Sequence, residues 1–311
     1  MEQFPTIDLS EPDSSMLRLV EACEDLGFFK VVNHGVPPEL IERLESEAVR
    51  FFSLPRSAKD KVGPPRPGPF GYGNRSIGCN GDVGRVEYLL MTADADSDYR
   101  KFASVFGGAA ADGFRRAVDD YLSAVKKMAC EILEVLADGL KVQPREAFSK
   151  LLKDEESDSV FRLNRYPPCN GAGESDPIGF GAHTDPQIIS VLRSNDAGGL
   201  QIVGRDGEWV SVPPDRNCFF INVGDSLQVM TNGRFKSVRH RVVANSPEAR
   251  LSMIYFGGPP LSEKIAPLPS LLIKDEDSLY KEFTWFDYKK SAYNTRLADN
   301  RLGLFEKIAA S

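Results

Sequence analysis

One histidine and one carboxylate stand two positions apart in this chain and are well suited to hold a metal ion together. They are His183 and Asp185, within Gly-Phe-Gly-Ala-His-Thr-Asp-Pro-Gln at residues 179–187. In a β-strand, residues i and i+2 point to the same face, so the imidazole and the carboxylate would project together. Such a pair is two thirds of the 2-His-1-carboxylate facial triad that holds non-haem Fe(II).

The third ligand has few candidates, because the chain contains only three histidines. His240 lies 55 positions after Asp185, in a run rich in β-branched residues that is typical of a strand. His34 ends a strand-like segment just before a Pro-Pro turn, and we expect a structural role for it. A His-x-Asp pair alone is a weak signal, since ordinary surface hydrogen bonding also produces it. The order and spacing of all three residues predict an iron site at His183, Asp185 and His240.

A second pair at strand spacing follows ten positions after His240, namely Arg250 and Ser252. A cosubstrate that chelates iron at one end and carries a carboxylate at the other would need a clamp of this kind, because the planar guanidinium grips a carboxylate through two parallel hydrogen bonds. Asn164 and Tyr166 form a third such pair. Taken alone, they would be ordinary sheet residues; beside the other pairs, we expect them to add hydrogen bonds to the cosubstrate.

The spacing of apolar residues, which predicts the helices and strands that position these pairs, changes near residue 158. Before it, apolar residues recur every three or four positions and predict helices over 13–25, 38–52 and 112–140. After it, the period becomes two, and strands are expected at 160–166, 178–183, 188–193, 200–203, 209–212, 218–223, 235–243 and 250–256. The Gly- and Pro-rich segment 63–84 predicts a long irregular loop, either a linker or a lid that faces a ligand.

The pattern therefore predicts an α+β fold with a mainly β core, an antiparallel sandwich or barrel wrapped by N- and C-terminal helices. Residues 1–157 form a helix-rich N-terminal part that packs on the core. Residues 158–260 form the core with the iron site, and residues 261–311 form a helical tail. The three parts are expected to make one structural unit.

The composition excludes several classes of protein. The chain has 311 residues, with 41% hydrophobic and 27% charged residues, which is typical of a globular protein. Its net charge of -7, without a Lys/Arg-rich run, argues against a nucleic-acid partner and against attachment to an anionic membrane. No run of about 18 apolar residues could span a membrane. The five cysteines are odd in number and irregularly spaced, which favours free thiols in a reducing compartment such as the cytosol.

The chain resembles the plant 2-oxoglutarate/Fe(II)-dependent dioxygenase family. The resemblance covers nearly the whole chain, from the stretch Gly27–Gly35 to the stretch Arg250–Ser252. Within that family it is similar to the gibberellin 2-oxidases that act on 19-carbon gibberellins. The stretches that carry this similarity are 71–74, 81–84, 86–90, 183–189, 251–260, 284–286 and 298–302. The iron motif is shared by the whole family, so only the flanking stretches bear on the substrate.

The resemblance implies a double-stranded β-helix (jelly-roll) core, a resident Fe(II), 2-oxoglutarate as cosubstrate and ascorbate as reductant. The far carboxylate of 2-oxoglutarate would lie on the Arg250/Ser252 pair, helped by Tyr166 and Asn164. The implied reaction hydroxylates a gibberellin at C2 with O2, releases succinate and CO2, and inactivates the hormone. The sequence leaves the oligomeric state open, self-association included.

Two other functions remain as alternatives. The first is another dioxygenase of the same family, with a flavonoid, auxin or another small carboxylic acid as substrate. The second is a relative that binds the hormone without turning it over, against which the presence of all the ligand and clamp residues argues. A purely structural jelly roll would need none of these residues.

A gibberellin is a rigid, largely apolar polycycle with a carboxylate, so its pocket should be mostly apolar, with one cation separate from Arg250. Arg75 is one candidate, beside Tyr72 in the Gly- and Pro-rich segment where a lid could close. Arg162 is the other, because it precedes the Asn/Tyr pair by two positions and would share its face. Phe256 would lie on the face of Arg250 and pack on the hydrocarbon rings. Each arginine could equally be a solvated surface charge.

Overall fold

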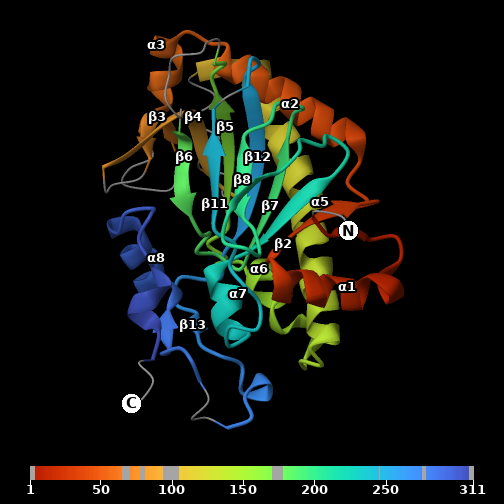
Figure 1. Ribbon diagram of the computed structural model, residues 1–311. Helices are drawn as coiled ribbons and strands as arrows, with labels where there is room; N and C mark the ends of the chain where they lie inside the picture. Colours follow the sequence, from red (N-terminus) through yellow and green to blue (C-terminus); the bar gives the residue numbers. More distant parts are fainter. Residues whose placement is uncertain are drawn as a thin grey trace.

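The computed structural model describes residues 4–64, 71–77, 81–93, 105–169, 178–244, 246–274 and 278–307. Its centre is a pair of β-sheets, with helices outside them (Figure 1). The larger sheet has the order β1 (Thr6–Asp8), β2 (Phe28–Val32), β10 (Phe219–Val223), β7 (Ile189–Ser194), β12 (Arg250–Gly257), β5 (Val160–Tyr166), β4 (Asp82–Thr92) and β3 (Gly71–Ile77). The smaller sheet has the order β6 (Ile178–His183), β11 (His240–Val243), β8 (Leu200–Val203) and β9 (Trp209–Ser211). Among these pairs, β1 and β2 alone run parallel.

The helices cover the outside of the larger sheet and one end of the molecule (Figure 1). Their bounds are α1 (Pro12–Asp25), α2 (Pro38–Phe52), α3 (Arg56–Lys59), α5 (Gly108–Gly139), α6 (Ser149–Lys153), α7 (Asp225–Met230) and α8 (Trp285–Asn294), and a small two-stranded sheet joins β13 (Lys264–Ile265) to β14 (Phe283–Thr284). Within the ranges given above, no helix is long and apolar enough to cross a membrane.

The long helix α5 is held by an apolar stripe that faces the larger sheet. Phe114, Val118 and Val125 are fully buried at helical spacing, as are residues further along the same face. The ring of Tyr121 lies 5.7 Å from that of Phe161 on β5, which places the helix across the middle strands. Each such side chain contributes about 1.5–3 kcal/mol by leaving water, so this helix is a large part of the core.

A second apolar layer lies between the two sheets. Phe180 and Val242 from the smaller sheet pack in one buried cluster with Leu192, Phe220 and Ile254 from the larger one. Inward residues of the two sheets alternate with outward ones along each strand, which is the packing of a sandwich. The predicted α+β class with a mainly β core is therefore confirmed, and the inner surfaces of the two sheets face the same interior.

The structure corrects two predicted elements. The segment 63–84, expected to be an irregular loop, contains the strand β3, which pairs with β4 and extends the larger sheet. The strand expected at 235–243 is shorter, because β11 begins only at His240. The preceding N–H groups bond elsewhere: Lys236 donates to the backbone oxygen of Cys23, and Ser237 donates to the side chain of Gln228. These two N–H groups therefore form no hydrogen bonds with a neighbouring strand.

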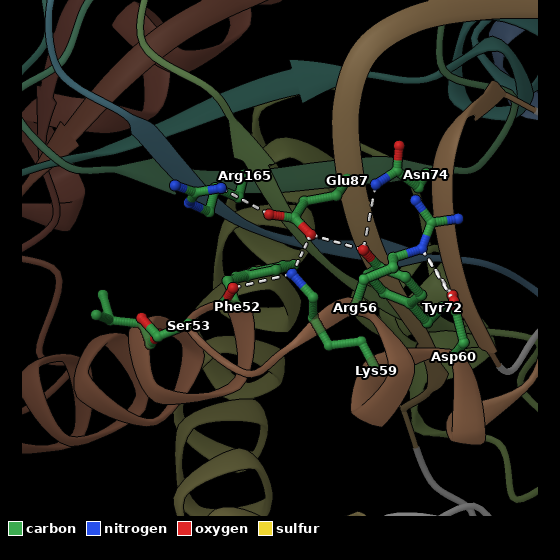
Figure 2. A network of polar contacts seen from close by, with 10 residues as sticks. Phe52, Ser53, Arg56, Lys59, Asp60, Tyr72, Asn74, Glu87 and Arg165 are labelled. Carbon is green, nitrogen blue, oxygen red and sulfur yellow. Dashed lines mark hydrogen bonds and ion pairs between the residues drawn. The ribbon is translucent and has the colours of Figure 1, made fainter.

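A buried ion-pair network joins the helical N-terminal part to the larger sheet (Figure 2). Glu87 on β4 accepts hydrogen bonds from Lys59 Nζ at 2.6 Å, from the Tyr72 hydroxyl at 2.6 Å and from Arg165 Nη1 at 2.7 Å. Lys59 also donates to the backbone oxygen of Phe52 at 2.9 Å. Burial alone would raise the pKa of Glu87, but these donors outweigh it and hold the pKa below its ordinary value.

We expect Glu87→Ala to lower the free energy of unfolding by about 3–5 kcal/mol, because it strands the ammonium of Lys59 without its counter-charge. Urea unfolding followed by circular dichroism measures the change. Glu282→Ala is the matched control, since its ion pair with Lys264 leaves side chains 56% and 70% exposed and should contribute less than about 1 kcal/mol. Equal losses in the two variants would show that the network does not stabilise the sheet.

Candidate active site

The three predicted metal ligands come together where β6 ends and β11 begins. His183 is the last residue of β6 and stands opposite His240, the first residue of β11. Asp185 lies just past the end of β6 rather than in the strand. The alternation of side chains along a strand, from which the sequence predicted that His183 and Asp185 share a face, therefore does not extend to Asp185. The Nε2 atoms of His183 and His240 are 3.6 Å and 3.7 Å from Asp185 Oδ1. One donor atom from each residue lies within 4.8 Å of the others.

Hydrogen bonds orient each of these side chains. The Nδ1 atom of His183 lies 2.8 Å from the backbone oxygen of Gly181, and that of His240 lies 3.1 Å from the backbone oxygen of Val238. A carbonyl oxygen can only accept, so Nδ1 carries the proton in both rings, and both Nε2 lone pairs face the third ligand. The donor atoms therefore converge on one point.

Two residues that the sequence did not suggest position the carboxylate. Ser190 Oγ donates to Asp185 Oδ2 at 2.6 Å, and Asn222 Nδ2 donates to the same oxygen at 3.1 Å. Oδ1 is thus left to face the imidazoles. Both residues are buried polar positions within otherwise apolar runs, Ile-Ile-Ser-Val-Leu at 188–192 and Phe-Phe-Ile-Asn-Val at 219–223. A lone amide or hydroxyl in such a run is the signal that could have found them.

The electrostatics favour the metal-binding forms of the ligands. Burial lowers the pKa of His183 well below its ordinary value, which favours the neutral ring. Burial would raise the pKa of Asp185, but the two imidazoles and the hydrogen bonds from Ser190 and Asn222 hold it below its ordinary value. Neutral imidazole and ionised carboxylate are the forms that coordinate a divalent metal. Two imidazoles and one carboxylate with space beside them fit Fe(II).

The predicted clamp is assembled on two adjacent strands. Arg250 stands opposite Tyr166, and Ser252 stands opposite Asn164, in the β12–β5 ladder. All four side chains are buried, and Arg250 is only 3% exposed. Asn164 Nδ2 donates to Ser252 Oγ at 3.3 Å. In the part of the chain that the structure describes, Arg250 Nη1 has no hydrogen-bond partner, which suits a site that awaits an anion.

The metal-ligand group and the clamp line one cavity. The empty space inside it is about 430 Å³ when the open mouth is included. Arg162 and Phe256 also line it, as the strand pattern suggested. The remaining wall is mostly apolar and consists of Phe180, Leu192, Leu200, Val242 and Ile254, together with Asn222.

The other two candidates for substrate binding lie away from the cavity wall. Arg75 is exposed on β3, with a left-handed backbone φ of 65°. Tyr72 is buried, and its hydroxyl donates to Glu87 in the network of Figure 2. Neither is among the lining residues given above, so a role for either in substrate binding remains a prediction.

His34 has the structural surroundings expected of it. Its Nδ1 accepts a hydrogen bond from the backbone N–H of Val36 at 3.1 Å, and its ring packs edge-on against Phe219 with centroids 4.6 Å apart. The side chain of His34 therefore stabilises a turn and packs against the core.

Comparison with known proteins gives a consistent result. Residues 157–259 match the model of the 2OG-Fe(II) oxygenase superfamily, and residues 4–100 match that of the non-haem dioxygenase in morphine synthesis N-terminal region. The chain is 61% identical to gibberellin 2-beta-dioxygenase 1 of Pisum sativum, over 99% of this chain and 92% of that protein. It is 57% identical to gibberellin 2-beta-dioxygenase 2 of Arabidopsis thaliana, over 98% of this chain and 88% of that protein.

Two solved structures share the fold. JOX2 in complex with 2OG, Fe and JA superposes with a TM-score of 0.85 and is 29% identical, covering 98% of this chain and 89% of that one. The dioxygenase for auxin oxidation from rice has a TM-score of 0.81 and is 27% identical, covering 98% and 100%. The jelly-roll arrangement of the two sheets is thereby established.

Proposed function

This chain belongs to the 2OG-Fe(II) oxygenase superfamily, and from that membership we propose that it is a gibberellin 2-beta-dioxygenase. It hydroxylates bioactive gibberellins at C2 and so inactivates the hormone, with Fe(II), O2 and 2-oxoglutarate, and it releases succinate and CO2. The observation that carries the proposal is the 61% identity to a gibberellin 2-beta-dioxygenase over 99% of the chain. The donor set and the clamp described above are those that this chemistry needs.

In this proposal His183, Asp185 and His240 hold the iron, which, when bound, activates O2 for hydroxylation of the substrate. The protein contributes orientation. Ser190 and Asn222 fix the rotation of the Asp185 carboxylate, and two backbone oxygens fix the tautomer of both imidazoles. Ligands held in this way lose little entropy when the metal binds.

The same proposal assigns 2-oxoglutarate to the clamp. Its far carboxylate would accept hydrogen bonds from Arg250 and Ser252, with Tyr166 and Asn164 beside them. Because these groups lie 3% exposed or less, the carboxylate would bind out of water, where charge-assisted hydrogen bonds are strong. The apolar wall of the cavity then excludes water from the reacting carbon.

A second candidate function is oxidation of another hormone acid. The likeness in fold to an auxin-oxidising dioxygenase and to JOX2 supports it, since those structures share the core. Their identities of 27% and 29% are less than half of the 61% to a gibberellin enzyme, which favours a gibberellin. We also propose a cytosolic location, supported by free thiols at all four cysteines that the structure describes.

The test is turnover by the purified protein. It is incubated with Fe(II), ascorbate, 2-oxoglutarate and a bioactive 19-carbon gibberellin, and the C2-hydroxylated product and succinate are measured by mass spectrometry. A gibberellin already hydroxylated at C2 serves as the matched control, and an auxin, a jasmonate and a flavonoid complete the panel. Product from the first gibberellin alone supports the proposal; product only from another acid would replace the substrate while leaving the reaction class in place.

A further inference from the structure

The cavity contains a second guanidinium group, distinct from the clamp. Arg162 lies two positions before Asn164 on β5 and lines the same wall. Its Cζ atom is 3.8 Å from the ring centroid of Tyr88 and 4.9 Å from that of Phe180, so the guanidinium is held between two aromatic rings. Its Nε donates to Asn164 Oδ1 at 2.7 Å. Three contacts therefore fix one cation against the cavity.

Within the described ranges no carboxylate forms an ion pair with Arg162, although the charge of Asp185, in the same cavity, acts on it. Nη2 of Arg162 is buried and, in the ranges that the structure describes, has no hydrogen-bond acceptor. Burial lowers the pKa of Arg162, as expected where the solvent has been removed and little opposite charge replaces it. Arg162 as a whole is only partly buried, but its Nη2 is buried without an acceptor, which indicates a ligand that supplies one.

Arg162 and Arg250 serve separate positions in the cavity. In the antiparallel β5–β12 ladder Arg250 stands opposite Tyr166, whereas Arg162 stands opposite Ile254, four residues away on each strand. Four residues of strand correspond to about 13 Å of backbone. One small dicarboxylate whose far end lies on Arg250 would not also neutralise Arg162 with that same carboxylate. The two guanidinium groups can therefore serve two different carboxylates.

We propose that Arg162 binds the carboxylate of the hormone substrate, and that Asn164 positions Arg162 and couples it to the 2-oxoglutarate site. This inference rests on the proposed function, because it takes the Arg250 clamp to be filled by 2-oxoglutarate. The ligand class is a rigid, largely hydrocarbon acid: the carboxylate lies on Arg162, and the rings lie against the apolar wall that includes Ile254 and Phe256.

The coupling follows from the two ends of the Asn164 amide. Its Oδ1 accepts from Arg162, and its Nδ2 donates to Ser252 Oγ, which belongs to the clamp. A cosubstrate that bonds to Ser252 fixes this amide, and the fixed amide holds Arg162 in place for the substrate. Coupling between two binding sites is reciprocal, so each ligand should raise the affinity for the other.

The first experiment compares Arg162→Gln with Arg116→Gln, a matched loss of charge at an exposed position of α5. Arg162→Gln should raise the KM for the gibberellin acid about 10- to 100-fold, the effect of one charged hydrogen bond, with a far smaller change in the KM for 2-oxoglutarate. The gibberellin methyl ester should be a poor substrate for the unaltered protein, and in Arg162→Gln the preference for acid over ester should disappear. Circular dichroism and iron content show that each variant is folded and loaded.

The outcomes separate this inference from the proposed function. If the unaltered protein hydroxylates acid and ester equally well, no cation binds the carboxylate, and the inference is overturned while the proposed function stands. If Arg75→Gln raises the KM for the acid and Arg162→Gln does not, Arg75 on β3 binds the carboxylate, and the assignment of Arg162 is wrong. If the unaltered protein hydroxylates no gibberellin at all, it is the proposed function that fails.

The second experiment tests the role of Asn164. The gibberellin acid is titrated calorimetrically into iron-loaded protein under anaerobic conditions, with and without 2-oxoglutarate. We expect 2-oxoglutarate to tighten binding about 5-fold or more in the unaltered protein and to have little effect in Asn164→Ala. A merely structural role for Asn164 would weaken both measurements together and leave their ratio unchanged, and that result would refute the coupling.

Discussion

Replacing Asp185 by alanine should abolish hydroxylation, with kcat/KM falling by at least about a thousandfold, or about 4 kcal/mol in transition-state stabilisation. Asp185 is the one carboxylate in the metal-ligand group, and its Oδ1 lies within 3.7 Å of both imidazole Nε2 atoms. His183→Ala and His240→Ala should have the same effect, because each removes one of the three donors. The overall fold should survive, since none of the three side chains belongs to the main apolar cluster.

Iron content and succinate production measure this effect in parallel. His34→Ala is the matched control, because it removes the remaining histidine of the chain at a position that packs on Phe219. That variant should keep its iron and turn over the substrate. Normal activity in any one of the three ligand variants would remove that residue from the iron site.

The second large effect is expected at the clamp. Arg250→Ala should raise the KM for 2-oxoglutarate about 10- to 100-fold, because a charged hydrogen bond contributes roughly 1.5–3 kcal/mol. The physical reason is the buried Nη1 of Arg250, which lacks an acceptor among the described residues and would gain one from the bound carboxylate. The opposing Tyr166 and the neighbouring Ser252 remain in the variant, so binding should be weakened rather than lost.

This effect is measured as the dependence of succinate formation on 2-oxoglutarate concentration at saturating gibberellin. Arg116→Ala on the exposed face of α5 is the control for loss of a positive charge. A change in the KM for the gibberellin alone would mean that Arg250 is misassigned and that the clamp belongs to the substrate.

Much of the site could be predicted from the sequence because strand parity is insensitive to errors in strand ends. The pairs Arg250/Ser252 and Asn164/Tyr166 share a face whichever residue ends the strand, and the ladder places them opposite each other. The same parity brought Arg162 and Phe256 to the cavity. The partnering of β5 with β12, by contrast, is a long-range pairing that no local pattern specifies.

The parts that could not be predicted depend on distant partners. Gly71 and Gly73 made β3 look irregular, yet Gly73 lies where a Cβ would come within 2.2 Å of the Tyr88 ring, so the strand needs a glycine there. Residues 235–239 looked like part of a strand because they lead into the β-branched Val242 and Val243, but the N–H groups of Lys236 and Ser237 bond to α1 and α7. Ser190 and Asn222 were missed because their partner, Asp185, lies on another element.

The position of β2 in the larger sheet has a consequence for synthesis of the protein. β2 pairs with β10 from Phe28 to Val31, and the two strands are separated by the residues between Val32 and Phe219. At roughly 5–20 residues per second, a ribosome needs about 10–40 s to make that intervening chain. Phe28 and Phe29 are fully buried in the folded protein, but in the nascent chain they lack their partner strand β10 during this time. Asn222, which orients Asp185, lies on the awaited strand. The iron site therefore becomes ordered late in synthesis, only after β2 has paired with β10 from the last third of the chain.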